Sequence, residues 1–143
     1  MRAVALCWLA GSLLLLGGCG DSGPKRAAVS GTVQVDGQPL KEGSINFFPV
    51  EDTQGPTAGA PIVDGKYQID RAKGVTVGKN RIVIEASRKS GRRIPNPMAP
   101  GTLTDEMVEM LPPEYNAKST QIRQIVAGSN TIDFDIKLGK ISK

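Results

Sequence analysis

Short runs in which apolar and polar residues alternate are the feature of this sequence that most limits its fold. The clearest lies at 131–138, where Ile132, Phe134 and Ile136 alternate with polar residues. Alternation with a period of two gives a β-strand one face for a core and one face for water. The other runs that we interpret as strands are 29–35, 44–49, 60–63, 66–69, 80–86 and 120–126.

The connections between these runs favour hairpins. Asp36-Gly37 and Asp64-Gly65 are tight-turn signals, because glycine adopts the positive φ that two-residue hairpin turns require. We interpret 51–59 and 70–79 as a loop and a linker, and 127–130 as a further turn. Seven short strands with frequent turns and no long amphipathic helix predict an all-β fold, namely a seven-stranded antiparallel β-sandwich.

One segment departs from this pattern. Residues 87–119 are 33 residues with five prolines and no alternation. Connections longer than about 12–15 residues are usually functional or disordered, so we expect one long proline-rich loop here. Within it, Thr104–Met110 is suited to one or two helical turns that begin at Thr104 and end before Pro112-Pro113.

The same loop contains a locally apolar stretch. We expect it to fold back as a lid over one end of the sandwich, and a partner-binding helix is the alternative. The residues concerned are Met107, Val108, Met110 and Leu111.

The beginning of the chain has the three parts of a secretory signal: a positive residue, an apolar stretch and small residues before a cysteine. The apolar stretch, Ala3 to Leu16, is shorter than the roughly 20 residues that cross a bilayer. Leu16-Gly17-Gly18-Cys19 has the pattern of a bacterial lipobox, so we expect cleavage before Cys19 and a diacylglyceryl group on its thiol. An ordinary signal peptide with a chance cysteine, or an uncleaved anchor, is the alternative.

Cleavage at this point divides the chain into a lipoprotein signal peptide (1–18), a lipidated tether (19–27) and one domain (28–143). Two acyl chains hold a protein firmly to a membrane. The expected location is therefore the cell envelope, lipid-anchored after secretion at the periplasmic or extracellular face. Without Arg2 the mature chain has 17 basic and 14 acidic residues, a mild net charge of +3.

Several segments resemble carboxypeptidase regulatory-like domains, and in particular short bacterial lipoproteins built on that domain. The resemblance covers about Ala28 to Leu138, almost the whole mature chain. It implies a transthyretin-like (prealbumin-like) β-sandwich and brings no catalytic residues, because its motifs are turn and core residues. The segments that carry it are Val29–Val33, Asp36–Leu40, Gly43–Pro49, Asp64–Tyr67, Leu111–Thr120 and Gly128–Ile136.

The composition argues against catalysis. The chain contains no histidine, which is the commonest general base and the commonest metal ligand. We therefore expect no enzyme, no cofactor and no metal site. Asp133 and Asp135 would share one strand face and could meet a Ca²⁺ ion, but a solvated outer face or an ion pair with Arg123 is favoured.

The densest charge cluster opens the long loop. It is a possible anionic-contact patch for lipid headgroups, an acidic envelope polymer or an acidic protein, and simple solvation is the alternative. Nucleic acid is not expected, since no aromatic residues interleave with the cations. The patch consists of Arg88, Lys89, Arg92 and Arg93.

Together these patterns predict a membrane-anchored, non-enzymatic lipoprotein of the cell envelope that serves as a binding or structural module. Its expected partners are the membrane, through the lipid on Cys19, and an envelope protein or polymer of unknown identity. The alternative is a protein that binds a small ligand or divalent ion, with its site in the 87–119 loop or on the outer sheet face.

Overall fold

The computed structural model describes residues 23–139. The predicted signal peptide and the predicted lipid-bearing Cys19 lie outside the described residues. The elements in chain order are β1 (Arg26–Val35), β2 (Gln38–Pro39), β3 (Glu42–Pro49), β4 (Ala58–Val63), β5 (Lys66–Ile69), the 3₁₀ turn η1 (Arg71–Lys73), β6 (Val75–Thr76), β7 (Gly78–Glu85), β8 (Ser87–Pro95), β9 (Leu103–Glu109), β10 (Ile122–Ile125), β11 (Ser129–Thr131) and β12 (Phe134–Ile136).

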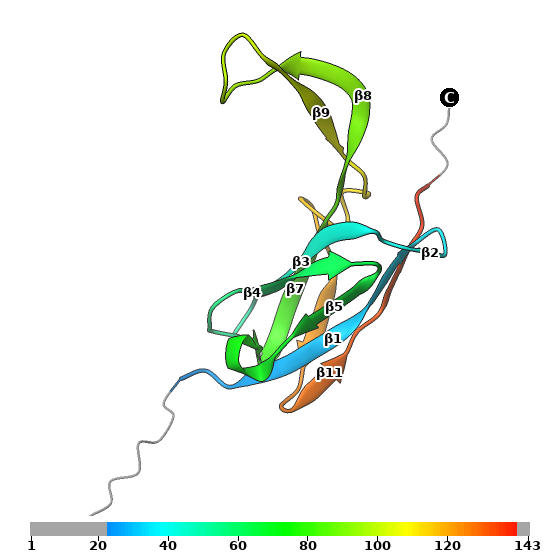
Figure 1. The fold of residues 1–143 in the computed structure, drawn as a ribbon. Coiled ribbons are helices and arrows are strands. Elements are labelled where there is room, and N and C mark those ends of the chain that lie inside the picture. The colour runs from blue at the N-terminus through cyan, green and yellow to red at the C-terminus, as the bar shows by residue number, and fades with distance from the viewer. Residues whose placement is uncertain (1–22, 140–143) are drawn as a thin grey trace, which may run out of the picture.

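The all-β prediction is confirmed, with one ten-stranded sheet as the body of the molecule (Figure 1). The main order is β10-β7-β3-β4-β5-β1-β11, and β2, β6 and β12 also pair with β1. Residues 126–128 alone connect β10 to β11, although these strands lie at opposite ends of the order. Three residues span at most about 11 Å, so the sheet has to curl until its ends approach each other. The result is a curled half-barrel.

Most neighbouring strands are antiparallel, as predicted, but the last two are not. β11 and β12 run parallel to β1, with Ala28 opposite Ser129 and Val33 opposite Phe134. The strands on either side of the predicted turn at 127–130 do not pair with each other. β10 pairs with β7 instead, so the turn carries the chain from one end of the curled sheet to the other.

The two Asp-Gly turns are confirmed. Asp36 and Gly37 have φ values of 50° and 78°, and Asp64 and Gly65 have values of 47° and 75°. Positive φ at both central residues is the geometry that matches the twist of the flanking strands. The 70–79 linker, in contrast, contains η1, β6 and the first residues of β7.

The core lies on the concave face of the sheet and follows the predicted alternation. In the last segment, Phe134 and Ile136 are buried while Asp133 and Asp135 are exposed. The largest fully buried apolar side chains are Phe47, Ile45, Ile62, Ile82, Ile84, Ile125, Ile136, Val29, Val33 and Val75.

The long-loop prediction for 87–119 is wrong in its first half. β8 and β9 form a separate two-stranded antiparallel sheet, and Figure 1 shows it projecting from one end of the half-barrel. Thr104–Met110 is therefore extended and not helical. Pairing with β8 satisfies the backbone N–H and C=O groups of this segment. We call the hairpin from 87 to 109 the arm.

The second half of the segment covers the end of the half-barrel from which the arm leaves. Leu111 is buried and Met110 packs against the core, so the predicted fold-back is confirmed for these two residues. The buried Asn116 donates to the Leu111 carbonyl at 3.1 Å, and the Ser119 hydroxyl donates to the carbonyl of Ile82 on β7. The amide of Met110 also donates to the carbonyl of Ala86 at 2.8 Å, which joins the two residues that flank the arm.

Candidate functional site

The two strands of the arm pair with an irregular register, and the carboxylate of Glu106 bridges the irregularity. Lys89 lies opposite Met107 and Arg93 lies opposite Asp105, so residues 90–92 of β8 face the single residue Glu106 of β9. The extra residues form a bulge, and a φ of 88° at its central Gly91 allows the chain to turn there.

Glu106 accepts hydrogen bonds from both sides of this bulge. Its Oε2 accepts from the Ser90 hydroxyl at 2.6 Å and from Arg92 Nε at 2.8 Å, and its Oε1 accepts from Arg92 Nη2 at 2.5 Å. The paired Arg92 guanidinium, and then the Ser90 hydroxyl, lower the pKa of Glu106. The bidentate pair raises the pKa of Arg92 in turn. Glu106 thus holds the bulge in one geometry.

The predicted anionic-contact patch lies entirely on β8, but β9 brings carboxylates to it. Lys89 Nζ lies 2.6 Å from Asp105, which lowers the pKa of that carboxyl, and Arg92 is held by Glu106. Arg93 donates to the Leu103 carbonyl at 2.9 Å. Neither Arg88 nor Arg93 has an ion pair within residues 23–139. Carboxylates of β9 therefore pair with two of the four cations of the predicted patch and leave the other two unpaired.

Sequence reasoning missed the two residues that matter most here. The predicted helix over Thr104–Met110 would place Asp105 and Glu106 in its first turn, because carboxylates favour a helix N-terminus. The available signal was two acidic residues about 14 positions after a cluster of cations, a spacing that a hairpin brings into register.

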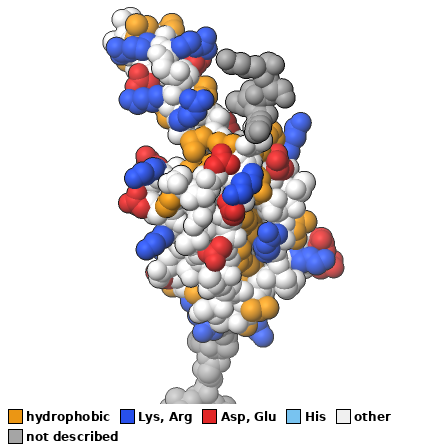
Figure 2. All heavy atoms as spheres, turned by 90° about the vertical axis from the view of Figure 1, so that its right-hand side faces the viewer, with side chains coloured by type: hydrophobic (Ala, Val, Ile, Leu, Met, Phe, Trp, Pro, Cys, Tyr) orange, Lys and Arg blue, Asp and Glu red, His pale blue; other side chains and the backbone are white. Residues whose placement is uncertain are grey.

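Exposed apolar side chains lie along the arm, from its base to its tip. Met98, in the connection between the strands, is 91% exposed, while Leu103 and Met107 on β9 are 53% and 55% exposed. Leu103 and Met107 share a strand face, because they are separated by an even number of residues. Figure 2 shows hydrophobic and basic side chains together on the projecting part of the molecule.

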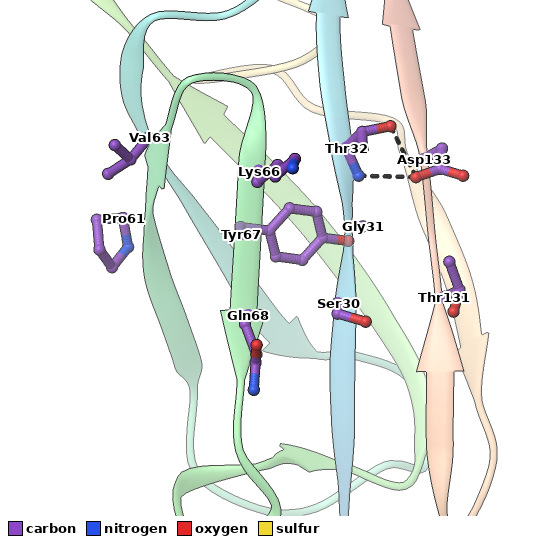
Figure 3. Close-up of a pocket in the computed structure, with 10 residues that line it drawn as sticks. All are labelled: Ser30, Gly31, Thr32, Pro61, Val63, Lys66, Tyr67, Gln68, Thr131 and Asp133. Carbon is purple, nitrogen blue, oxygen red and sulfur yellow. Dashed lines mark hydrogen bonds between the residues drawn. The ribbon is translucent and has the colours of Figure 1, made fainter.

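A second candidate lies on the outer face of β4, β5 and β1, where a shallow open hollow has a volume of about 670 Å³ (Figure 3). Asp133 is its only carboxylate, and its Oδ1 accepts from the amide of Thr32 at 2.7 Å and from the Thr32 hydroxyl at 2.8 Å. The lining residues are Ser30, Gly31, Thr32, Pro61, Val63, Lys66, Tyr67, Gln68, Thr131 and Asp133.

Tyr67 crosses behind this hollow and joins β5 to the segment between β11 and β12. Its hydroxyl donates to the carbonyl of Ile132 at 2.7 Å, and Figure 3 shows the hydroxyl beside Gly31. Burial, and then the nearby carboxylate of Asp133, raise the pKa of Tyr67. The phenol is therefore a structural hydrogen-bond donor at neutral pH.

The predicted pair Asp133 and Asp135 has other partners than those expected. Asp135 binds Lys137 at 2.9 Å and Asp133 binds Thr32, whereas the guanidinium of Arg123 lies over the ring of Phe134. Both carboxylates are exposed, as expected for a solvated outer face, whereas the other alternative, an ion pair with Arg123, is wrong. Among the described residues, no group of three or more histidine, cysteine or acidic side chains could hold a metal ion. No helix within 23–139 is long and apolar enough to cross a membrane.

No protein-family model and no curated protein matches this chain.

Proposed function

We propose that this protein is a membrane-anchored, non-enzymatic module of the cell envelope that binds a protein partner through the exposed apolar side chains of its arm. The observation that carries the proposal is the arm itself, which leaves the half-barrel at the end away from the start of β1 (Figure 1). Lipidation at Cys19 would hold the chain start near the membrane and let the arm point away from it.

The energetics of the arm support a binding role. An isolated two-stranded hairpin is marginally stable in water, because it has no sheet face to bury. This arm nevertheless exposes Met98, Leu103 and Met107 to solvent. Exposed apolar groups that gather on a projecting element are typical of a contact surface. The Glu106 contacts would keep that surface ordered before a partner arrives.

The anchor is tested by Cys19→Ala in the full chain. We expect the wild-type protein in the detergent phase after phase separation, and the variant either unprocessed or in the aqueous phase. Detergent-phase partitioning and processing that this substitution leaves unchanged would overturn the anchor.

The arm is tested by placing a photo-crosslinking amino acid at Met98 or at Met107 in cells. We expect the same protein adduct from both positions and none from Lys118, which is exposed but lies outside the arm. Adducts with lipid alone, or equal adducts from all three positions, would overturn a protein partner.

The alternative, a small-ligand or ion site on the outer sheet face, is favoured by the hollow beside Asp133 and Lys66. It predicts that one solute raises the unfolding temperature in a saturable way. A screen of divalent ions, sugars and peptides tests it, with Asp133→Asn as the control. If no solute stabilises the protein, this alternative is excluded.

We also propose that the half-barrel is a transthyretin-like sandwich of the carboxypeptidase regulatory-like class. The two Asp-Gly turns and the buried alternation at Phe134 and Ile136 support this assignment. An experimentally determined structure, superposed on members of that class, tests it. A strand order that differs from theirs would remove the assignment.

A further inference from the structure

Four basic residues surround the point at which the described chain begins. Figure 1 places η1, drawn in green, beside the blue start of β1, and all four side chains are exposed. We call this set the basic collar, and it consists of Lys25, Arg26, Arg71 and Lys73.

The collar is held by backbone contacts and is not a loose tail. The amide of Val77 donates to the carbonyl of Lys25 at 2.8 Å, and Arg26 lies opposite Thr76 in the β1–β6 pairing. Arg26 Nη1 also approaches the carbonyl of Ala72 in η1 at 3.4 Å. A side chain at Gly74 would lie 2.5 Å from the carbonyl oxygen of Ala27, so η1 packs closely on β1.

The charge around the collar has one sign. A hollow of about 930 Å³ beside it is lined by Lys25, Arg26 and Arg71 with no acidic residue. None of the collar cations has an ion pair within residues 23–139. The nearest acidic residue in sequence, Asp70, accepts instead from Gln68 Nε2 at 2.9 Å. The collar cations, unlike Lys89 and Arg92 on the arm, are therefore open to an external anion.

We propose that the basic collar contacts the headgroups of anionic phospholipids and so sets the orientation of the domain on the membrane. This inference rests on the proposed lipid anchor. Lys25 follows Cys19 by six residues, which span at most about 20 Å even when fully extended. A cation near an anionic membrane surface gains about 1 kcal/mol, a factor of roughly five in the bound population.

The test uses the lipidated full chain with a fluorophore on a single introduced cysteine. Cys7 and Cys19 are the only native cysteines, and the anchor would leave neither one free for labelling. Ala72→Cys reports from the collar, and Met98→Cys reports from the distal end of the arm. Both are reconstituted into vesicles of phosphatidylcholine alone or with one third phosphatidylglycerol, which contain a headgroup-attached quencher.

We expect quenching at position 72 to rise with phosphatidylglycerol and to fall in high salt, while position 98 stays unquenched. The triple variant K25Q/R26Q/R71Q should lose this response, by roughly fivefold in the docked-to-undocked ratio for each cation removed. The matched control K41Q/K118Q/K137Q removes three exposed cations elsewhere and should retain it.

The outcomes separate the two proposals. Protein that fails to float with either vesicle type contradicts the lipid anchor. Protein that floats with both, but whose position 72 is indifferent to phosphatidylglycerol or to the collar substitutions, overturns the collar contact and leaves the anchor standing.

Discussion

At the scale of single residues, one glycine allows the first and last strands of the described chain to lie close together. A Cβ added at Gly31 would lie 1.9 Å from the carbonyl oxygen of Ile132 and 3.1 Å from the Tyr67 hydroxyl. The absence of a side chain lets the segment between β11 and β12 approach β1 and receive the Tyr67 hydrogen bond. Gly31 lies at an inward position of its strand, so a side chain there would clash with the Ile132 carbonyl.

Gly31→Ala should therefore destabilise the protein by about 1–3 kcal/mol, the range of an overpacked core. The shift in the midpoint of urea-induced unfolding measures the effect.

Gly139→Ala is the control for this substitution. No atom lies within 4 Å of the Cβ that it would add, so its effect should stay within about 0.5 kcal/mol. Equal unfolding midpoints for the two variants would show that the close approach of Ile132 to β1 does not contribute to the free energy of unfolding.

At the scale of the element, the arm depends on polar contacts more than on burial. Its strands have alternation-breaking residues, a three-residue bulge and mostly exposed side chains. At its base, Glu109 Oε1 accepts from the amides of Ala86, Met110 and Leu111. Ionised Glu106 is consequently the main side-chain constraint on the bulge.

Removing the charge of Glu106 should loosen the arm without affecting the half-barrel. Glu106→Gln loses the charge-assisted pair, and acid has the same effect on the wild type. Because the pKa is lowered in the folded arm, the stabilisation is full above the ordinary glutamate value of 4.5 and is lost as pH falls through the lowered value. Amide hydrogen exchange should accelerate at residues 90–93 and stay unchanged at Ile82.

Asp105→Asn is the matched control for this prediction. This substitution breaks a single ion pair, the one with Lys89. That pair is exposed to solvent, since the Lys89 side chain is 71% exposed and the Asp105 side chain is 42% exposed. Exchange in the arm should therefore change less than in Glu106→Gln. A larger effect from Asp105→Asn would show that Asp105, and not Glu106, is the main constraint on the arm.

At the scale of the whole molecule, the segments before and after the arm both contribute strands to the same sheet. Everything before the arm supplies β1 to β7, while everything after it supplies β10 against β7 and β11 and β12 against β1. A break within the arm would cut the chain into two pieces, each of which completes the sheet of the other.

Limited trypsin digestion should therefore cut first after the arm cations, among them Arg92 and Arg93, because the arm has the least buried apolar surface. The nicked protein should remain folded and elute as one species in gel filtration, and mass spectrometry identifies the cut. Fragments that separate under native conditions would show that the pairing of β10 with β7 cannot hold them.

Much of the half-barrel could be predicted from local patterns. The Asp-Gly turns and the inward positions Phe134 and Ile136 depend on backbone sterics and on a period of two, both of which are local properties. Where the local pattern was mixed, as at Ile122 and Ile125, only the pairing with β7 decided that Ile125 is buried.

The arm could not be predicted, because its order comes from partners that only the tertiary structure brings together. Its sequence lacks alternation, and the prolines around it suggested a loop. The contacts of Glu106 with Ser90 and Arg92 join residues 14 to 16 positions apart. By itself the sequence determined most strands of the half-barrel and its two Asp-Gly turns, while the anchor at Cys19 stays a prediction. The tertiary structure decided the parallel return along β1, the curl of the sheet and the arm, since each depends on contacts between segments distant in sequence.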